Sequence, residues 1–111
     1  MGRMRRGDIV TVAGGVYASK ARPALVLQDD RFDATDSLTV CPFTTTEVEA
    51  PLLRVPVRAD EDNGLDQDSY LMIDKVTTVR RTHAHAVLGR LDGALMVELE
   101  RRLLVFLGFG G

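Results

Sequence analysis

The chain has 111 residues, of which 45% are hydrophobic and 27% charged, and its formal net charge is −2. This length accommodates one folded domain, spanning residues 1–111, but not two. Its apolar runs fall far short of the roughly 20 residues that cross a bilayer, and none follows the N-terminal arginines as in a signal peptide. The single cysteine, Cys41, excludes an internal disulfide and is typical of a cytoplasmic protein.

Charge is unevenly distributed along this nearly neutral chain. Residues 1–28 hold five basic residues and one acid, residues 75–91 hold four basic residues and no acid, and residues 60–68 hold five acids. Such a split can give one face of the protein a basic surface for a nucleic acid. Charges scattered over solvated loops explain the same pattern, and the charges alone favour this simpler interpretation.

The N-terminal part predicts an arm, a strand and a loop. Residues 1–6 are expected to form a short arm, in which Met4 is a second candidate start. Residues 8–13 are rich in β-branched side chains and predict a strand. The glycine pair at 14–15 ends this strand, and residues 16–21 are expected to form a short loop.

The second predicted strand begins at Pro23 and continues through the apolar residues 24–27. Arg22 precedes it and is expected at the exposed mouth of the strand, because an unpaired guanidinium is costly to bury. A polar loop over residues 28–37 leads to a third strand at 38–41, which runs on into Thr44. If these strands are antiparallel, Arg22 and Thr44 meet at one end of the sheet.

Four further short strands and a helix complete the prediction. The strands are expected at residues 52–57, 70–73, 76–79 and 87–91, the first limited to an edge or an interrupted ladder by Pro51 and Pro56. An acidic loop over residues 58–68 contains the turn signal Asn63-Gly64. The helix is expected over residues 93–106, with Asp92 as N-cap and Gly108 at its end. Its apolar stripe consists of Leu95, Met96, Leu99, Leu103 and Phe106.

No P-loop, GxSxG, HExxH or CxxC motif is present in the sequence. Four aspartates in the loop 28–37 offer oxygen ligands for Mg²⁺ or Ca²⁺, but the central Gly and closing Glu of a calcium loop are missing. We therefore predict no metal and no cofactor. His83 and His85 would share a face of an extended segment, and an exposed surface position is favoured for both.

Several short patterns, taken in order, resemble the MazF/PemK toxins, the ribonuclease halves of bacterial toxin–antitoxin pairs. They are RGDIV at 6–10, RPALV at 22–26, VCPFT at 40–44 and LMID at 71–74. The resemblance covers about residues 4–108. It implies a mainly β fold with one helix, an SH3-like antiparallel β-barrel of the CcdB/PemK type with a C-terminal helix. It also implies a cytoplasmic, sequence-specific and metal-independent endoribonuclease that cleaves single-stranded RNA.

The resemblance assigns roles to particular residues. Arg22 would bind two oxygens of the scissile phosphate and Thr44 would donate its hydroxyl to it. Asp74 matches a position regarded as a general base in one branch, which has an Arg where this chain has Met72. The base stays open among Asp74, a histidine and a bound water, and a purely structural role is the alternative for Arg22, paired with Asp8 or Asp74. Further RNA contacts are expected from Lys20, Gln28, Thr45, Thr46, Lys75 and Arg80.

The implied partners are single-stranded RNA, a cognate antitoxin whose acidic tail shares the RNA groove, and a second copy of the chain in a homodimer. DNA would be reached only through the antitoxin. Exposed apolar groups for a dimer are expected at Phe43, Leu52, Leu53 and Phe109. One alternative is a CcdB-like toxin that poisons DNA gyrase, which uses a Trp-Gly-Ile ending, whereas this chain has no Trp. The other is an SH3-like module that binds RNA or protein without catalysis.

Overall fold

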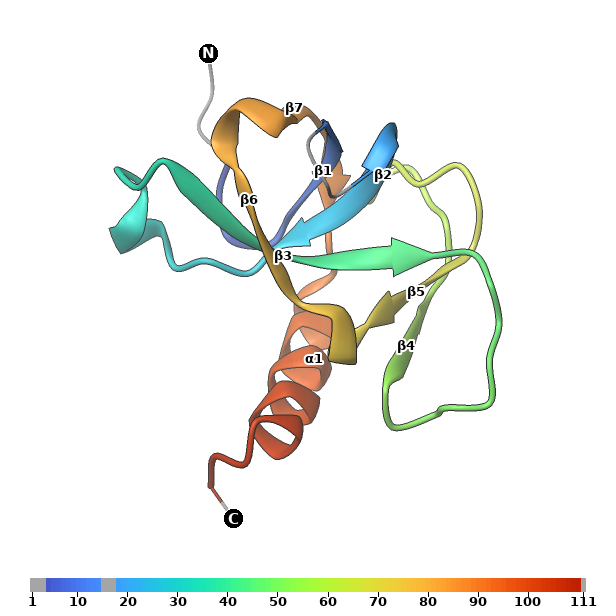
Figure 1. Cartoon of the computed structure of the whole chain (residues 1–111). Coiled ribbons are helices and arrows are strands. Elements are labelled where there is room, and N and C mark those ends of the chain that lie inside the picture. Colours follow the sequence, from blue (N-terminus) through green and yellow to red (C-terminus); the bar gives the residue numbers. More distant parts are fainter. Residues whose placement is uncertain (1–3, 15–17, 111) are drawn as a thin grey trace.

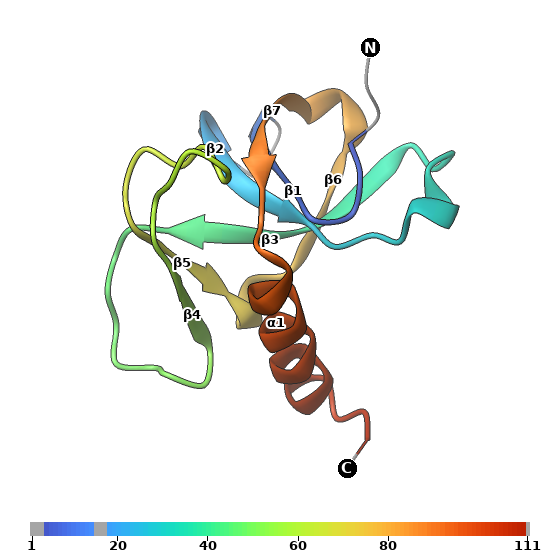
Figure 2. The same ribbon diagram turned by 180° about the vertical axis from the view of Figure 1, so that it is seen from behind.

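A computed structural model describes residues 4–14 and 18–110. In these residues an antiparallel sheet of seven strands is followed by one α-helix, which projects from the sheet (Figures 1 and 2). Three single 3₁₀ turns, η1 (Asp30–Phe32), η2 (Ile73–Lys75) and η3 (Arg81–His83), lie between strands. The strands and helix are β1 (Asp8–Gly14), β2 (Ala18–Val26), β3 (Ser37–Thr44), β4 (Arg54–Val57), β5 (Ser69–Met72), β6 (Thr77–Arg80), β7 (Ala84–Arg90) and α1 (Gly93–Phe106).

The long strand β3 is the centre of the sheet. The strand order is β4-β5-β3-β2-β1-β7, and β6 also pairs with β3. Each pair of neighbouring strands is antiparallel. Across the described ranges no pairing joins the outer strands β4 and β7, so the sheet is open rather than closed into a barrel. The predicted mainly β fold with one C-terminal helix is confirmed.

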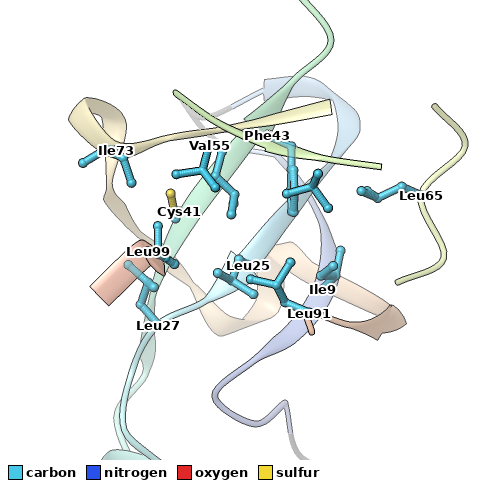
Figure 3. Packing of buried hydrophobic residues seen from close by; sticks show 12 residues of the cluster. Ile9, Leu25, Leu27, Cys41, Phe43, Val55, Leu65, Ile73, Leu91 and Leu99 are labelled. Atoms are coloured by element: carbon cyan, nitrogen blue, oxygen red, sulfur yellow. The ribbon is translucent and has the colours of Figure 1, made fainter. Parts of the chain in front are cut away.

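The strands β1 to β3 are buried on both faces. Ile9 and Leu25 pack in the larger core cluster together with Leu99 of α1 (Figure 3), whereas Val10 and Val26 pack in a second cluster on the other face. Successive side chains of a strand point to opposite faces, so two covered faces require a continuous apolar run. This explains the sequence Ala-Leu-Val-Leu at 24–27 without alternating polar residues.

Cys41 lies in the larger cluster with no exposed surface. Burial raises the pKa of its thiol to about 12. The hydrogen bond between Sγ and the carbonyl of Met72 acts to lower this pKa, but burial outweighs it. A thiol with so high a pKa stays protonated and unreactive at neutral pH. The cysteine is therefore a packing residue.

The helix α1 begins and ends where the sequence predicts. The side chain of Asp92 accepts a hydrogen bond of 3.1 Å from the backbone N–H of Ala94, and Gly108 follows the helix with a φ of +83°. Leu99 is fully buried, and Leu95, Met96 and Leu103 pack beside it at the edge of the larger cluster. Phe106, the last member of the predicted stripe, is 48% exposed because the helix extends past the sheet there.

The N-terminal segment corrects one prediction. Residues 1–3 lie outside the described residues, but residues 4–6 are not a free arm. The N–H of Arg5 donates to Asp8 at 2.8 Å, and the guanidinium of Arg6 forms an ion pair of 2.6 Å with Glu100 of α1. Arg6 also donates to the carbonyl of Leu27, which ties this segment to both the sheet and the helix.

The predicted loop over residues 16–21 is also partly wrong. Residues 15–17 lie outside the described residues, but Ala18 already belongs to β2 and pairs with Gly14 of β1. Strand β2 is therefore longer than predicted, and Arg22 lies inside it, opposite Val12. None of the described helices is long and apolar enough to cross a membrane.

Candidate active site

The candidate site lies where β2 and β3 separate. Their ladder pairs Val26 with Val40 and ends with the pair of Ala24 and Pro42. Pro23 and Pro42 have no N–H with which to extend the ladder, and the two strands splay apart beyond them (Figure 1). Strand β3 then pairs with β5, while the first half of β2 stays with β1.

An open cavity of about 400 Å³ fills the gap between the separated strands. Arg22 from β2 and Thr44 from β3 line it. If the β2–β3 ladder continued two residues beyond Ala24 and Pro42, Arg22 and Thr44 would be the next pair on the same face. Met72 and Lys75 line it from β5 and η2, and Thr77 from β6. The structure therefore brings Arg22 and Thr44 to one cavity, although Arg22 lies inside β2 and not at the mouth of its strand as predicted.

The guanidinium of Arg22 is exposed and has no hydrogen-bond or ion-pair partner within residues 4–14 and 18–110. The acids that a structural role would require are taken by other arginines. Asp8 pairs with Arg90 at 2.5 Å, and Asp74 pairs with Arg54 at 2.6 Å. Arg22 thus keeps all five N–H donors for a bound anion.

The hydroxyl of Thr44 is held in one orientation by the chain that follows β3. The backbone N–H of Thr46 donates to Oγ1 of Thr44 at 3.1 Å. Because this bond uses an oxygen lone pair, the hydroxyl proton stays available for donation into the cavity. Arg22 and Thr44 therefore offer a cation and a hydroxyl donor to one ligand, as a phosphate diester requires.

Comparison with known proteins gives this site a context. A family model described as "PemK-like, MazF-like toxin of type II toxin-antitoxin system" matches residues 5–107. The chain is also 55% identical over 109 residues to a protein of Mycolicibacterium smegmatis named "Probable endoribonuclease MazF", covering 97% of this chain and 100% of the relative.

The chain belongs to the PemK/MazF toxin family.

Two solved structures show the same fold at lower identity. An endoribonuclease from a mycobacterial species, solved with its cognate antitoxin, has a TM-score of 0.79 at 23% identity, with 96% of this chain and 97% of that chain covered. A MazE-MazF structure from Deinococcus radiodurans has a TM-score of 0.82 at 21% identity, with 99% and 100% covered. These matches span the whole sheet and α1, so the separated strands of the site lie within the shared PemK/MazF fold.

Asp74 differs from its predicted setting in the family site. It lies in η2 beside the cavity but is not among the residues that line it. Partial desolvation acts to raise the pKa of Asp74, but the hydrogen bond and the charge of Arg54 outweigh it, so the pKa is lowered below the ordinary value. A carboxylate with a lowered pKa is a weaker general base.

Arg54 was not among the predicted site residues of this PemK/MazF chain. It lies directly opposite Met72 in the β4–β5 pair, so a neighbouring strand supplies the arginine that the sequence lacks at position 72. Its side chain is only 12% exposed, and its guanidinium also donates to the carbonyl of Leu53 at 2.9 Å, while its Nε has no partner among the described residues. The ion pair of Arg54 and Asp74 could be found only from the register of β4 against β5, because the two residues lie 20 positions apart in the sequence.

Four of the predicted RNA-binding residues lie at or near the cavity. Lys20 is exposed on β2 two residues before Arg22, in the irregular part of the β1–β2 pairing. Lys75 lines the cavity itself, and Thr45 and Thr46 are exposed directly after Thr44. Their contacts with RNA remain predictions.

Gln28 and Arg80 are not brought to this cavity. The side-chain amide of Gln28 is engaged within its own loop, because it donates to the carbonyl of Phe32 and to Oγ1 of Thr35 at 2.8 Å each, and accepts from the N–H of Thr39. Arg80 is exposed at the far end of β6 and lines a different cavity of about 500 Å³. Neither position adds to the arrangement around Arg22.

The histidines lie apart from the cavity. His83 belongs to the 3₁₀ turn η3 and His85 to β7, so the two do not share one face of an extended segment as predicted. His85 is exposed, with Nε2 at 3.4 Å from the carbonyl oxygen of Ala13. Neither histidine is among the residues that line the cavity.

Proposed function

We propose that this chain is the endoribonuclease toxin of a type II toxin–antitoxin pair, and that it cleaves single-stranded RNA at specific sequences with Arg22 and Thr44. The observation that carries the proposal is the exposed guanidinium of Arg22, which has no partner within residues 4–14 and 18–110 and shares an open cavity with Thr44. The family match and the name of the 55% identical relative support the same activity.

The proposed reaction is the attack of a ribose 2′-oxygen on the adjacent phosphorus. The 2′-proton leaves to a base, the bond from phosphorus to the 5′-oxygen breaks, and that oxygen takes up a proton. The products are a 2′,3′-cyclic phosphate and a 5′-hydroxyl end. Arg22 and Thr44 would stabilise the negative charge that builds up on the phosphate oxygens.

This reaction needs no metal-bound water, because the nucleophile belongs to the substrate. The guanidinium of Arg22 supplies the charge that a metal ion would otherwise provide at the phosphate. Asp74 serves best as the partner that fixes Arg54 and η2, since its pKa is lowered. The proton of the 2′-hydroxyl would then pass to a bound water or to the substrate itself.

The activity is tested by incubating the protein with a mixed RNA in the presence of EDTA. We expect discrete fragments whose 5′ ends are hydroxyls, detected by labelling with polynucleotide kinase without prior phosphatase treatment. Loss of cleavage on chelation, or 5′-phosphate ends, would contradict the proposed reaction. An unchanged gyrase supercoiling activity in the same preparation distinguishes this toxin from a gyrase poison.

We also propose that the chain acts in the cytoplasm as a homodimer controlled by its antitoxin. The family description supports the antitoxin partner. The last turns of α1 and the chain beyond them support a dimer, because Val105 and Phe109 are 79% and 63% exposed, and Leu52 nearby is 81% exposed. Exposed apolar groups of this kind mark association surfaces. The expected exposure of Phe43 is wrong, since this ring is buried at 4% exposure.

Light scattering at micromolar concentration should therefore give about twice the chain mass of 12.2 kDa. Val105→Asp should shift the protein towards the single-chain mass, because a charge in an apolar interface is costly to desolvate. Circular dichroism of the variant provides the control for folding, since Val105 is exposed in the single chain. A wild-type mass of one chain would contradict a stable dimer.

A further inference from the structure

A second, larger cavity adjoins the candidate site on the side away from Arg22. It measures about 680 Å³ and is lined by residues of β4, β5 and the loop 45–53 that follows β3. Tyr70 lines it, and Tyr70 is the direct cross-strand partner of Thr44. Opposite residues of an antiparallel pair project from the same face with Cα atoms about 4.5–5.5 Å apart. The two cavities therefore meet at the pair of Thr44 and Tyr70.

Tyr70 provides an aromatic surface in this second cavity. The residue is partly exposed, and Pro56, its partner on the other side in β4, lines the same cavity. An aromatic side chain at the surface of an RNA-cleaving protein is suited to stack on an unpaired base. The Tyr70 side of the cavity therefore suits a nucleobase better than a phosphate.

The charges around the second cavity point to the same class of ligand. Arg54 is bound to Asp74, and Arg102 is bound to Glu98 at 2.8 Å and to the carbonyl of Pro51 at 2.5 Å. Their charges are thus partly neutralised within the protein, whereas Glu47 and Glu49 line the cavity without a hydrogen-bond or ion-pair partner in the described part of the chain. Free carboxylates repel phosphate but accept hydrogen bonds from amino groups of bases.

We propose that this cavity is a nucleobase subsite, in which the base next to the scissile phosphate stacks on Tyr70 and offers an exocyclic amino group to Glu47 or Glu49. The proposal rests on the proposed function, because it takes Arg22 and Thr44 as the phosphate site. Adenine, cytosine and guanine carry such an amino group, whereas uracil presents carbonyl oxygens in its place. The subsite therefore selects against uracil at one position beside the cut.

The test begins with the wild-type cut sites, mapped by sequencing the fragments of a randomised RNA. On an oligonucleotide that contains the preferred site, Tyr70→Ala should raise KM by about 10- to 100-fold with little change in kcat, because base stacking is worth about 1–3 kcal/mol. Tyr70→Phe keeps the ring and should stay within a few-fold of wild type. Phe32→Ala removes another exposed aromatic ring, on η1 away from β5, and should leave KM unchanged.

The carboxylates are tested by the pair of changes Glu47→Ala and Glu49→Ala in one protein, which removes both hydrogen-bond acceptors. The preference for an amino-bearing base over uracil at one position beside the cut should fall by about 10- to 100-fold. A wild-type KM in Tyr70→Ala would overturn the stacking site, and an unchanged base preference in the double alanine variant would overturn the role of the carboxylates.

Binding of an uncleavable 2′-deoxy analogue, measured by fluorescence anisotropy, distinguishes failure of the subsite from failure of the proposed function. If wild type binds the analogue through Tyr70 but cuts no RNA, the proposed cleavage is wrong and the base subsite stands. If the Kd for the analogue does not change in Tyr70→Ala, the subsite is overturned, whatever the cleavage activity. Melting temperatures of all variants exclude unfolding as the cause of a change.

Discussion

Arg22→Lys should impair RNA cleavage nearly as strongly as Arg22→Ala, by about 10²–10³-fold in kcat, which corresponds to about 2.7–4 kcal/mol of transition-state stabilisation. Lysine retains the charge but loses the planar fork that binds two phosphate oxygens together. Single-turnover cleavage of an oligonucleotide with the preferred site measures this loss without a contribution from product release.

The melting temperature decides whether this loss is catalytic. Arg22 is exposed and forms no ion pair in the described residues, so both variants should melt within about a degree of wild type, as is usual for surface changes. Arg101→Ala, which removes another exposed arginine on α1, should leave both cleavage and melting unchanged. Parallel losses of stability and cleavage would instead make Arg22 a structural residue.

Local signals were sufficient to predict α1 but not the start of β2. Asp92, the apolar stripe and Gly108 all act within one helical segment, so each could be read from the sequence. Residues 18–22 instead lack large apolar side chains, and what makes them a strand is their pairing with β1. Phe43 shows the same limit, because its ring is buried in the larger core cluster, whose members come from elements distant in the sequence.

The two central residues of the site could be predicted because they flank apolar strands that are close in the sequence. Thr44 and Arg22 are separated by one loop, and antiparallel pairing of 24–26 with 40–42 is enough to bring them together. The partners that leave Arg22 free could not be predicted. Arg54 reaches Asp74 from β4, and Arg90 reaches Asp8 from β7, through sheet pairings that only the fold establishes.

Thr44→Val should lower the cleavage rate by up to the same 10²–10³-fold, whereas Thr44→Ser should stay within a few-fold of wild type. Valine keeps the β-branched shape that suits the end of β3 but removes the hydroxyl donor. Serine keeps that donor, and its Oγ can still accept the N–H of Thr46, as Thr44 does at 3.1 Å. If only the hydroxyl matters, the single-turnover rate should therefore fall from wild type to Thr44→Ser and further to Thr44→Val.

A role in strand packing predicts the opposite order for these two variants. Valine would then be the milder change, because it preserves volume and β propensity, and serine the more harmful one, because it loses a methyl group. The N–H of Thr46 is exposed and can bond to water in the valine variant, so its melting temperature should change little. A valine variant that cleaves as fast as wild type would remove Thr44 from the site and leave Arg22 and Lys75 as the phosphate-binding groups in the cavity.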